Sequence, residues 1–359
     1  MDSNNDLALQ RHRWVPVRLV GRRKISSDTN TYTFALPENK TMLGLETCQH
    51  VQIGFHLRDR MLIRQYTPTR PLLPVTVTPG PPKASHAQVV ASTTTAKKKA
   101  KKKKKQNGRQ EGIGNGNELE VCTADRREHL PPAPPPNTPA DSLSRAGSLS
   151  GSSSTGLGSL VDGQGDGTFD LTIKTYLPTG DQPGGAMSNI LDCMPLGSEV
   201  EIRGPTGDIV YQGNGFFRIE GQPPRHFKRV SIVLGGSGIT PGYALMARIV
   251  LAPGDNTEVR VVDANKTEED ILLRDELDKL EKIGRQKGGQ VCITHVLSRP
   301  EEAWTGERGV VNERILKTSL FGPDRESVAL LCGPPGLVQG AVLPVLRGKS
   351  SDASKVFES

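Results

Sequence analysis

The chain has 359 residues, enough for two or three domains of about 100–200 residues each. Its net charge is +7, but a lysine run at 97–105 contributes eight positive charges, and without them the balance would be −1. The basic character is therefore local, and because no aromatic residue interrupts the run, we expect no nucleic-acid partner. The five cysteines are odd in number and scattered without metal-ligand spacing, so the sequence suggests neither a disulfide framework nor a metal site.

Membrane and secretory classes are also disfavoured. No stretch approaches the roughly 20 apolar residues that cross a bilayer. The first residues do not form a signal peptide, so the sequence predicts a cytoplasmic protein without a membrane span.

The first half of the chain reads as short strands. Residues 1–13 are polar, and we expect them to be a disordered N-terminus. Over 14–74, strand-like runs are separated by turn residues with no helix between them, which is typical of an antiparallel sheet or barrel. The predicted strands are 17–20, 31–36, 50–55 and 61–66.

Residues 75–166 break this pattern. They contain the lysine run, a proline cluster and a Ser/Gly tract, with sparse apolar residues. Such a segment buries too little surface to offset its ordering entropy, so we predict a disordered, low-complexity insertion. Strands resume over 167–222, so one barrel is interrupted by its own loop. The resumed part is predicted to contain strands 169–176, 199–203, 210–211 and 216–219, and a helix at 187–193.

From residue 227 to 359, strands alternate with helices. This alternation predicts a parallel sheet covered by helices on both faces, with ligands beyond the carboxyl ends of its strands. The predicted strands are 230–234, 258–262, 290–296 and 327–332, and the predicted helices are 241–251, 268–282, 312–318 and 336–346.

The turn at 235–241 follows the first of these strands. Gly235, Gly236 and Gly238 allow a sharp bend and a close approach to a ligand, and the following helix presents free N–H groups that favour a phosphate. A nucleotide site and a plain strand-to-helix turn explain this stretch equally well. The spacing is not the Gly-x-Gly-x-x-Gly dinucleotide fingerprint.

Three further motifs carry chemistry only in combination. Arg64-Gln-Tyr-Thr offers a guanidinium fork, a ring and a hydroxyl, although alone it would be a surface strand end. The run from Gly184 to Ser188 offers backbone amides for a phosphate or is an ordinary glycine-rich loop. In the run from Cys332 to Gly336, an isolated cysteine is more often a small buried residue than a reactive thiol.

In this order, the four motifs resemble the ferredoxin–NADP reductase superfamily, in its NADH–cytochrome b5 reductase branch. Within that branch, the chain is most similar to the C-terminal FAD/NAD(P)H reductase module of fungal nitrate reductases. The resemblance spans 14–74 and 167–346 and includes the motifs at 174–176, 204–207 and 270–274. It implies an FAD-binding β-barrel followed by an NAD(P)-binding α/β domain, with FAD and either NADPH or NADH as cofactors.

The resemblance also implies an enzyme. It would take a hydride from NAD(P)H and pass electrons one at a time to a haem acceptor, a cytochrome b5-type domain or protein. The alternative is a catalytically impaired regulatory or scaffold protein that keeps the reductase fold. None of the seven histidines precedes Pro-Gly-Gly, the segment that a haem domain would require, so this chain alone is not expected to reduce nitrate.

Residue roles carried over by the resemblance fall on both halves. Arg64 would hold the FAD pyrophosphate, Tyr66 would pack on the flavin, and Thr67 would lie near flavin N5. The remaining phosphate–adenosine side of FAD would be bound by Gly185, Met187 and Ser188. The nicotinamide coenzyme would be bound by Lys174, Tyr176, Gly236, Ser237, Gly238, Thr240, Cys332, Gly333 and Pro334. The residues nearest the chemistry would be Thr67, Thr240 and Cys332.

The choice of coenzyme depends on the strand ends. Ser298 and Arg299 follow the strand at 290–296, where a guanidinium would pair with a 2′-phosphate, although a solvated arginine in a surface loop is the commoner case. Asp263 argues more weakly for NADH, since a carboxylate can accept from a free ribose hydroxyl. We predict NADPH.

Overall fold

The computed structural model describes residues 7–58, 60–70, 166–180, 183–347 and 356–358, the last of these as backbone only. The chain divides into one compact unit of residues 1–78 and 151–359 and a second of 79–150, and the second lies outside the described residues. The predicted insertion at 75–166 therefore falls almost entirely outside them. The prediction of disorder over 1–13 is wrong for 7–13: Ala8 and Leu9 are buried, and their amides donate to the carbonyls of Met42 and Leu43.

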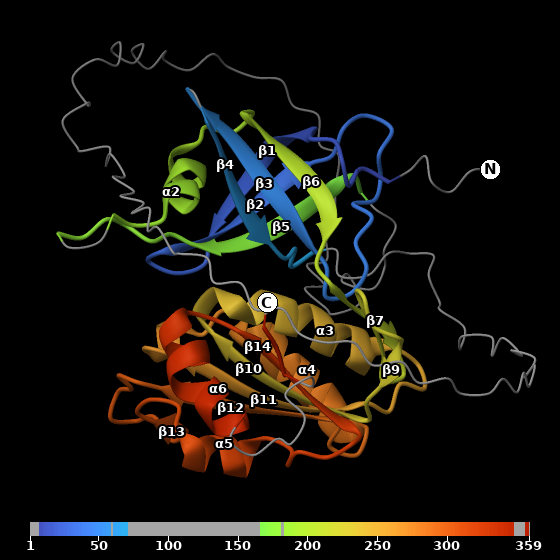
Figure 1. The fold of residues 1–359 in the computed structure, drawn as a ribbon. Coiled ribbons are helices and arrows are strands. Elements are labelled where there is room, and N and C mark those ends of the chain that lie inside the picture. Colours follow the sequence, from blue (N-terminus) through green and yellow to red (C-terminus); the bar gives the residue numbers. More distant parts are fainter. Residues whose placement is uncertain (1–6, 59, 71–165, 181–182, 348–355, 359) are drawn as a thin grey trace, which may run out of the picture. The chain divides into compact units, whose positions relative to one another are not determined.

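The first sheet of the larger unit is antiparallel and barrel-like (Figure 1). Its strand order is β4-β3-β6-β1-β2-β5. Just beyond β4, Arg70 forms a bridge to Asp170 of β5, so the two edge strands of the sheet meet. The strands are β1 (Val15–Lys24), β2 (Thr29–Ala35), β3 (His50–Leu57), β4 (Arg60–Tyr66), β5 (Thr168–Lys174) and β6 (Glu199–Thr206).

Alternate side chains of these strands fill the barrel. Phe34 of β2 and Phe169 of β5 stack with ring centroids 5.4 Å apart. Helix α2 (Ala186–Cys193) packs on the barrel, with Met187 and Leu191 buried in the same core. This helix is therefore fixed by its apolar side while its N-terminus remains available to a ligand.

A small sheet follows the barrel, made of β7 (Ile209–Gly213), β8 (Phe216–Ile219) and β9 (Arg225–His226). Its Phe217, and Phe227 just after it, belong to the same hydrophobic core as Val230 and Ile232 of the next sheet. The small sheet thus packs as part of the α/β half.

The second large sheet has the order β13-β12-β11-β10-β14-β15 and is entirely parallel. On one face, Ile232 packs with residues of α3 and α4, and on the other Val233 packs with residues of α5 and α6. The predicted fold class is confirmed. The strands are β10 (Arg229–Gly235), β11 (Glu258–Asn265), β12 (Val291–Leu297), β13 (Glu307–Arg308), β14 (Ser327–Cys332) and β15 (Val356–Glu358). The helices are α3 (Ile239–Leu251), α4 (Arg274–Gln286), α5 (Glu313–Ser319) and α6 (Leu343–Arg347).

Two predicted helices differ from the structure. The one at 268–282 is interrupted: a 3₁₀ turn, η3 (Glu268–Asp270), ends before α4, and Leu273 between them has a left-handed backbone with φ of 58°. The Asp270 side chain closes this turn by accepting from Thr267. The helix at 336–346 begins as a π-helix, η4 (Gly336–Val342), where Pro344 lacks the N–H that an α-helix would direct to the carbonyl of Gly340.

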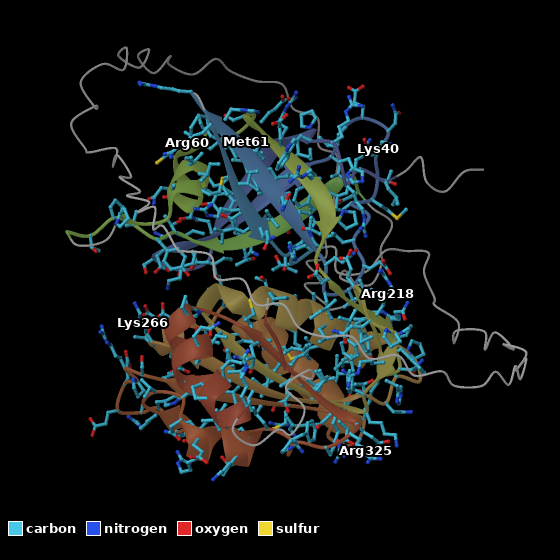
Figure 2. The ribbon with its side chains drawn as sticks, viewed as in Figure 1. Lys40, Arg60, Met61, Arg218, Lys266 and Arg325 are labelled. Carbon is cyan, nitrogen blue, oxygen red and sulfur yellow. The ribbon has the colours of Figure 1, made fainter. Side chains whose placement is uncertain are left out.

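The outer surface is charged, and Arg60, Lys266 and Arg325 are exposed there (Figure 2). Within the described residues, no helix has both the length and the apolar character that a membrane crossing needs.

Candidate functional site

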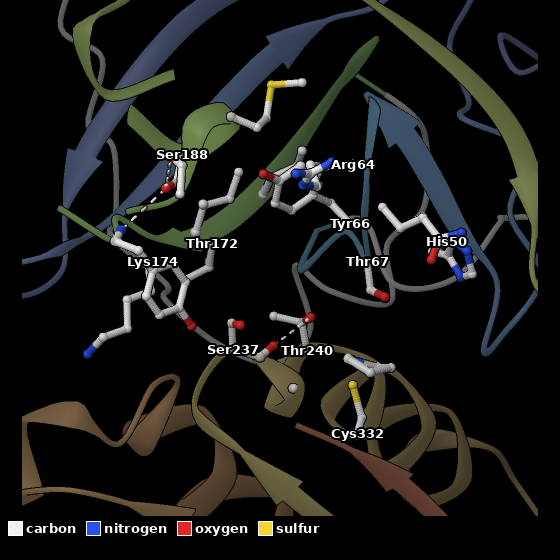
Figure 3. A pocket seen from close by; sticks show the side chains of 18 of the residues that line it. His50, Arg64, Tyr66, Thr67, Thr172, Lys174, Ser188, Ser237, Thr240 and Cys332 are labelled. Atoms are coloured by element: carbon white, nitrogen blue, oxygen red, sulfur yellow. Dashed lines mark hydrogen bonds between the residues drawn. The ribbon is translucent and has the colours of Figure 1, made fainter. Parts of the chain in front are cut away.

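One pocket of about 420 Å³ collects most of the residues singled out from the sequence (Figure 3). Its volume lies within the range of small-molecule sites, about 300–1,000 Å³. Its walls come from β4, β5 and the α2 turn on one side and from the carboxyl ends of β10 and β14 on the other. The predicted residues that line it are Arg64, Tyr66, Thr67, Lys174, Tyr176, Gly185, Met187, Ser188, Ser237, Gly238, Thr240, Cys332, Gly333 and Pro334.

Strand β4 delivers the first motif to the pocket. Because side chains alternate along a strand, Arg64 and Tyr66 lie on one face. Arg64 is exposed, and its Nη1 donates to the carbonyl of Ile63 at 2.8 Å. Burial raises the pKa of Tyr66, so its hydroxyl stays protonated and available as a donor. A cation and a flat ring with a polar tip are therefore presented side by side.

The α2 turn supplies backbone donors. Gly184 has a φ of +74°, and a Cβ there would lie 2.6 Å from the carbonyl oxygen of Tyr176, so only glycine fits. The first helical bond runs from Asn189 N to Gly185 O, which leaves the amides of residues 186–188 without an acceptor inside the helix.

The Ser188 hydroxyl closes the turn before α2. It donates to Gly185 O at 2.9 Å and accepts from the amide of Tyr176 at 3.2 Å. With Ser188 only 5% exposed, its side chain fastens the turn, and its backbone amide is the group left for a ligand.

The turn after β10 is held against the end of β14. It forms a 3₁₀ turn, η2 (Gly236–Gly238), and then enters α3. A Cβ on Gly238 would lie 2.3 Å from the carbonyl oxygen of Cys332. Thr240 donates to Ser237 O at 3.2 Å, which fixes the start of α3. The two strand ends thus form one continuous wall, with the half-buried Cys332 in it.

His50 is a lining residue that the sequence reasoning missed. Burial lowers its pKa, so the imidazole is neutral, and its buried Nε2 has no hydrogen-bond partner among the described residues. The register pairs Val51 of β3 with Tyr66 of β4, which places His50 opposite Thr67. An antiparallel pairing of the strands predicted at 50–55 and 61–66 is the signal that could have revealed it.

Lys174 reaches the pocket with two partners. Its Nζ lies 2.8 Å from Asp28 Oδ2 and 2.6 Å from Asp270 Oδ1. Burial lowers the pKa of Lys174, but the hydrogen bonds and charges of both carboxylates raise it by a larger amount, so the net shift is upward. The ammonium therefore stays charged.

The remaining predicted residues are not among those lining the pocket. Gly236 lies within the wall turn. Ser298 and Arg299 are exposed just after β12, and their amides donate to the carbonyls of Asn265 and Lys266. Asp263 is 1% exposed; its Oδ2 accepts from Asn265 and His295, and its buried Oδ1 has no hydrogen-bond partner among the described residues.

The arrangement fits FAD. The Arg64 guanidinium and the free amides of α2 suit a pyrophosphate, and the Tyr66 ring suits a flat heterocycle. The buried Nε2 of His50, which has no partner among the described residues, would gain a hydrogen bond from a ligand that carries ring nitrogens or carbonyls. By contrast, among the described residues no group of three or more His, Cys, Asp or Glu is arranged for a metal ion.

Comparison with known proteins identifies both halves. Residues 16–72 and 158–211 match the oxidoreductase FAD-binding domain family, and residues 232–342 match the oxidoreductase NAD-binding domain family. Among solved structures, the cytochrome b5 reductase domain of Ulva prolifera nitrate reductase superposes with a TM-score of 0.67 at 24% identity, over 98% of this chain and 99% of that one.

Nitrate reductases are among its relatives in sequence. The nitrate reductase [NADH] of Spinacia oleracea is 42% identical over 183 residues, 50% of this chain and 19% of that protein. The nitrate reductase [NADPH] of Emericella nidulans is 39% identical over 172 residues, 48% of this chain and 19% of that protein. The predicted resemblance and cofactor classes are confirmed, and the chain spans about a fifth of the length of these relatives.

Proposed function

Because the chain belongs to the oxidoreductases that join an FAD-binding domain to an NAD-binding domain, we propose that it oxidises NADPH or NADH and passes the electrons singly to a cytochrome b5-type haem acceptor. The observation that carries this proposal is that one pocket brings the β4 motif together with the turns after β10 and β14. FAD and the nicotinamide supply the hydride and electron transfer. We place the reaction in the cytoplasm.

The chain's own contribution to FAD binding is electrostatic and steric. Arg64 and the free N-terminal amides of α2 would neutralise the FAD phosphates. Tyr66 would support the ring system, with Thr67 and the neutral His50 offering hydrogen bonds at its polar edge. These groups form no covalent intermediate, so their work is orientation and exclusion of water.

The opposite wall would bind the nicotinamide coenzyme. The missing side chains of Gly238 and Gly333 let the turn after β10 and the end of β14 pack directly against each other, and together they form the wall that the coenzyme would face. Thr240 and Cys332 would border the reacting ring, and Lys174 and Tyr176 would contact the coenzyme from β5. The protein thereby keeps the two reactants in register rather than moving a proton.

For the coenzyme we propose NADPH. Arg299 is exposed at the carboxyl end of β12, where its guanidinium can pair with a 2′-phosphate dianion without breaking an existing contact that the structure records. The test compares steady-state ferricyanide reduction with NADPH and NADH in wild type and Arg299→Ala. An unchanged coenzyme preference in the variant contradicts the assignment.

The function itself is tested by purifying the chain and recording its absorption spectrum. We expect a yellow protein that reduces ferricyanide, and a soluble cytochrome b5, with NADPH or NADH. A colourless protein that neither retains added FAD nor reduces ferricyanide refutes the proposal. A chain that retains FAD but oxidises neither coenzyme refutes the enzymatic role and leaves only the binding fold.

A further inference from the structure

The ammonium of Lys174 is held by carboxylates from two distant segments of the chain. Asp28 lies in the turn between β1 and β2, whereas Asp270 lies in η3 between β11 and α4. Asp28 is also tied to the end of β5 because Thr175 N donates to its carbonyl at 2.6 Å. Lys174 is 16% exposed at its side chain, so this trio is largely shielded from water.

Each carboxylate is oriented before it meets the lysine. In Asp270, Oδ2 accepts from the amide and hydroxyl of Thr267, both at 3.1 Å, which leaves Oδ1 for Lys174. In Asp28, Oδ1 accepts from Ser26 and Thr29, which leaves Oδ2. Both acceptors are therefore fixed by their own turns, and their directions determine where the ammonium lies.

The charges of the trio limit what Lys174 can do for a ligand. One ammonium and two carboxylates carry a net charge of −1, which repels a pyrophosphate instead of attracting it. Two of the three ammonium N–H groups have partners among the described residues, so a third can reach the pocket. A neutral oxygen is the partner that such a group suits best.

We propose that Asp28 and Asp270 are positioning residues that hold Lys174 so that its third N–H donates to an uncharged oxygen of the nicotinamide coenzyme, a ribose hydroxyl or the carboxamide. The two carboxylates convert a mobile cation into a fixed hydrogen-bond donor at the mouth of the pocket. This inference rests on the proposed function, since it deepens the coenzyme site described above.

The direction in which one substitution changes coenzyme affinity decides between this role and the alternative, in which Lys174 is a counter-ion for the pyrophosphate. Asp270→Asn keeps an oxygen for Thr267 and changes the atom that faces the lysine. If the carboxylate positions Lys174, loss of its charge weakens binding of NADP⁺ or NAD⁺ by about tenfold, the scale of one charge-assisted hydrogen bond. If the carboxylate competes with the pyrophosphate, the same change tightens binding.

The experiment measures the dissociation constants of NADP⁺ and NAD⁺ on the FAD-loaded chain by isothermal titration calorimetry. Asp270→Asn and Asp28→Asn should both raise the constant, and neither change should have a further effect in a Lys174→Met background. In steady state, the change should appear mainly in KM for the coenzyme, because the reacting groups are untouched. Asp278→Asn, which removes a more exposed carboxylate from α4, serves as the matched control and should leave the constant unchanged.

The outcomes separate the two proposals. A wild-type chain that binds neither NADP⁺ nor NAD⁺ refutes the proposed function and this inference with it. A wild-type chain that binds, combined with an unchanged or lower constant in Asp270→Asn, overturns the positioning role alone. An effect of Asp270→Asn that persists in the Lys174→Met background has the same consequence. If Asp270→Asn loses FAD or unfolds, Asp28→Asn carries the same test from the other side of the lysine.

Discussion

The contact between Gly238 and the end of β14 gives a sharp test of the coenzyme wall. In Gly238→Ala, the new Cβ would lie 2.3 Å from the Cys332 carbonyl oxygen and 2.7 Å from its carbonyl carbon. Both atoms are backbone, and Leu234 of β10 pairs with Cys332 in the sheet. The end of β14 therefore has to move as a unit, until the oxygen is at least 3.0 Å away.

Such overpacking in a close contact costs about 2 kcal/mol, which lowers the thermal midpoint by about 4–8 °C in a domain of this size. The effect on catalysis should be larger, because a displacement near 1 Å can reduce the rate by about 100-fold. We expect coenzyme-driven ferricyanide reduction to fall by about this factor while the FAD content stays unchanged. Thermal unfolding followed by fluorescence, the ferricyanide assay and the flavin absorbance of the same preparation measure the three quantities.

Gly336→Ala is the matched control, because Gly336 belongs to the motif of Cys332, which Gly238 contacts. A Cβ at Gly336 meets nothing within 4 Å, and its backbone is not left-handed, so the substitution should leave the midpoint unchanged or raise it slightly. If Gly238→Ala keeps the wild-type midpoint and turnover, the contact between the two strand ends does not constrain the wall, and our reasoning about it is wrong.

Three further predictions concern other parts of the fold. Arg64→Leu should weaken FAD binding by about tenfold or more, measured by flavin fluorescence, whereas Arg60→Leu on the exposed end of the same strand should not; equal losses would contradict the assignment. Tyr211→Phe removes a buried 2.6 Å hydrogen bond to Asp255 and should cost about 1–3 kcal/mol in urea unfolding without loss of FAD; an unchanged midpoint would count against it. Burial raises the pKa of Asp270, but its ion pair and hydrogen bonds lower it by a larger amount, so the pKa is lower in the folded state than in the unfolded state. The stability that the carboxylate contributes is therefore complete above about pH 4 and is lost as the pH falls through the pKa of the folded state. Asp270→Asn should therefore lose less thermal stability than wild type between about pH 5 and pH 3, and parallel curves would refute this.

The sequence predicts the fold well because its strands are long and regular. The barrel strands and the four central strands of the parallel sheet occur close to their predicted positions. Strands β9 and β13, of two residues each, and β15, of three, were missed because so few residues cannot show a period of two. The break at Leu273 was also missed, since a left-handed leucine depends on the packing of Ile271 and Leu272 rather than on its own preference.

The site was predictable where a motif is local and not where it depends on distant contacts. The turns around Gly185 and Gly238 can be predicted because glycines mark them in the sequence. The tasks of Ser188 and Lys174 cannot, because they depend on Tyr176, on Asp28 and on Asp270, which only the folded chain brings within bonding distance. The sequence therefore identifies which residues line the pocket, whereas the structure identifies which of their atoms are still able to bond to a ligand.

The bridge that joins β4 to β5 also determines how the chain tolerates change between them. The Arg70 guanidinium pairs with Asp170 at 2.9 Å and with Asp166 at 3.0 Å, so residues 70 and 166 are clamped together. The two described ends of the β4–β5 connection therefore lie next to each other, and the closure entropy of a flexible connection between such ends changes by only about 0.6 kcal/mol for each doubling of its length. We therefore expect that a linker of different length, or an inserted domain, can connect residues 70 and 166 while the β-barrel keeps its architecture.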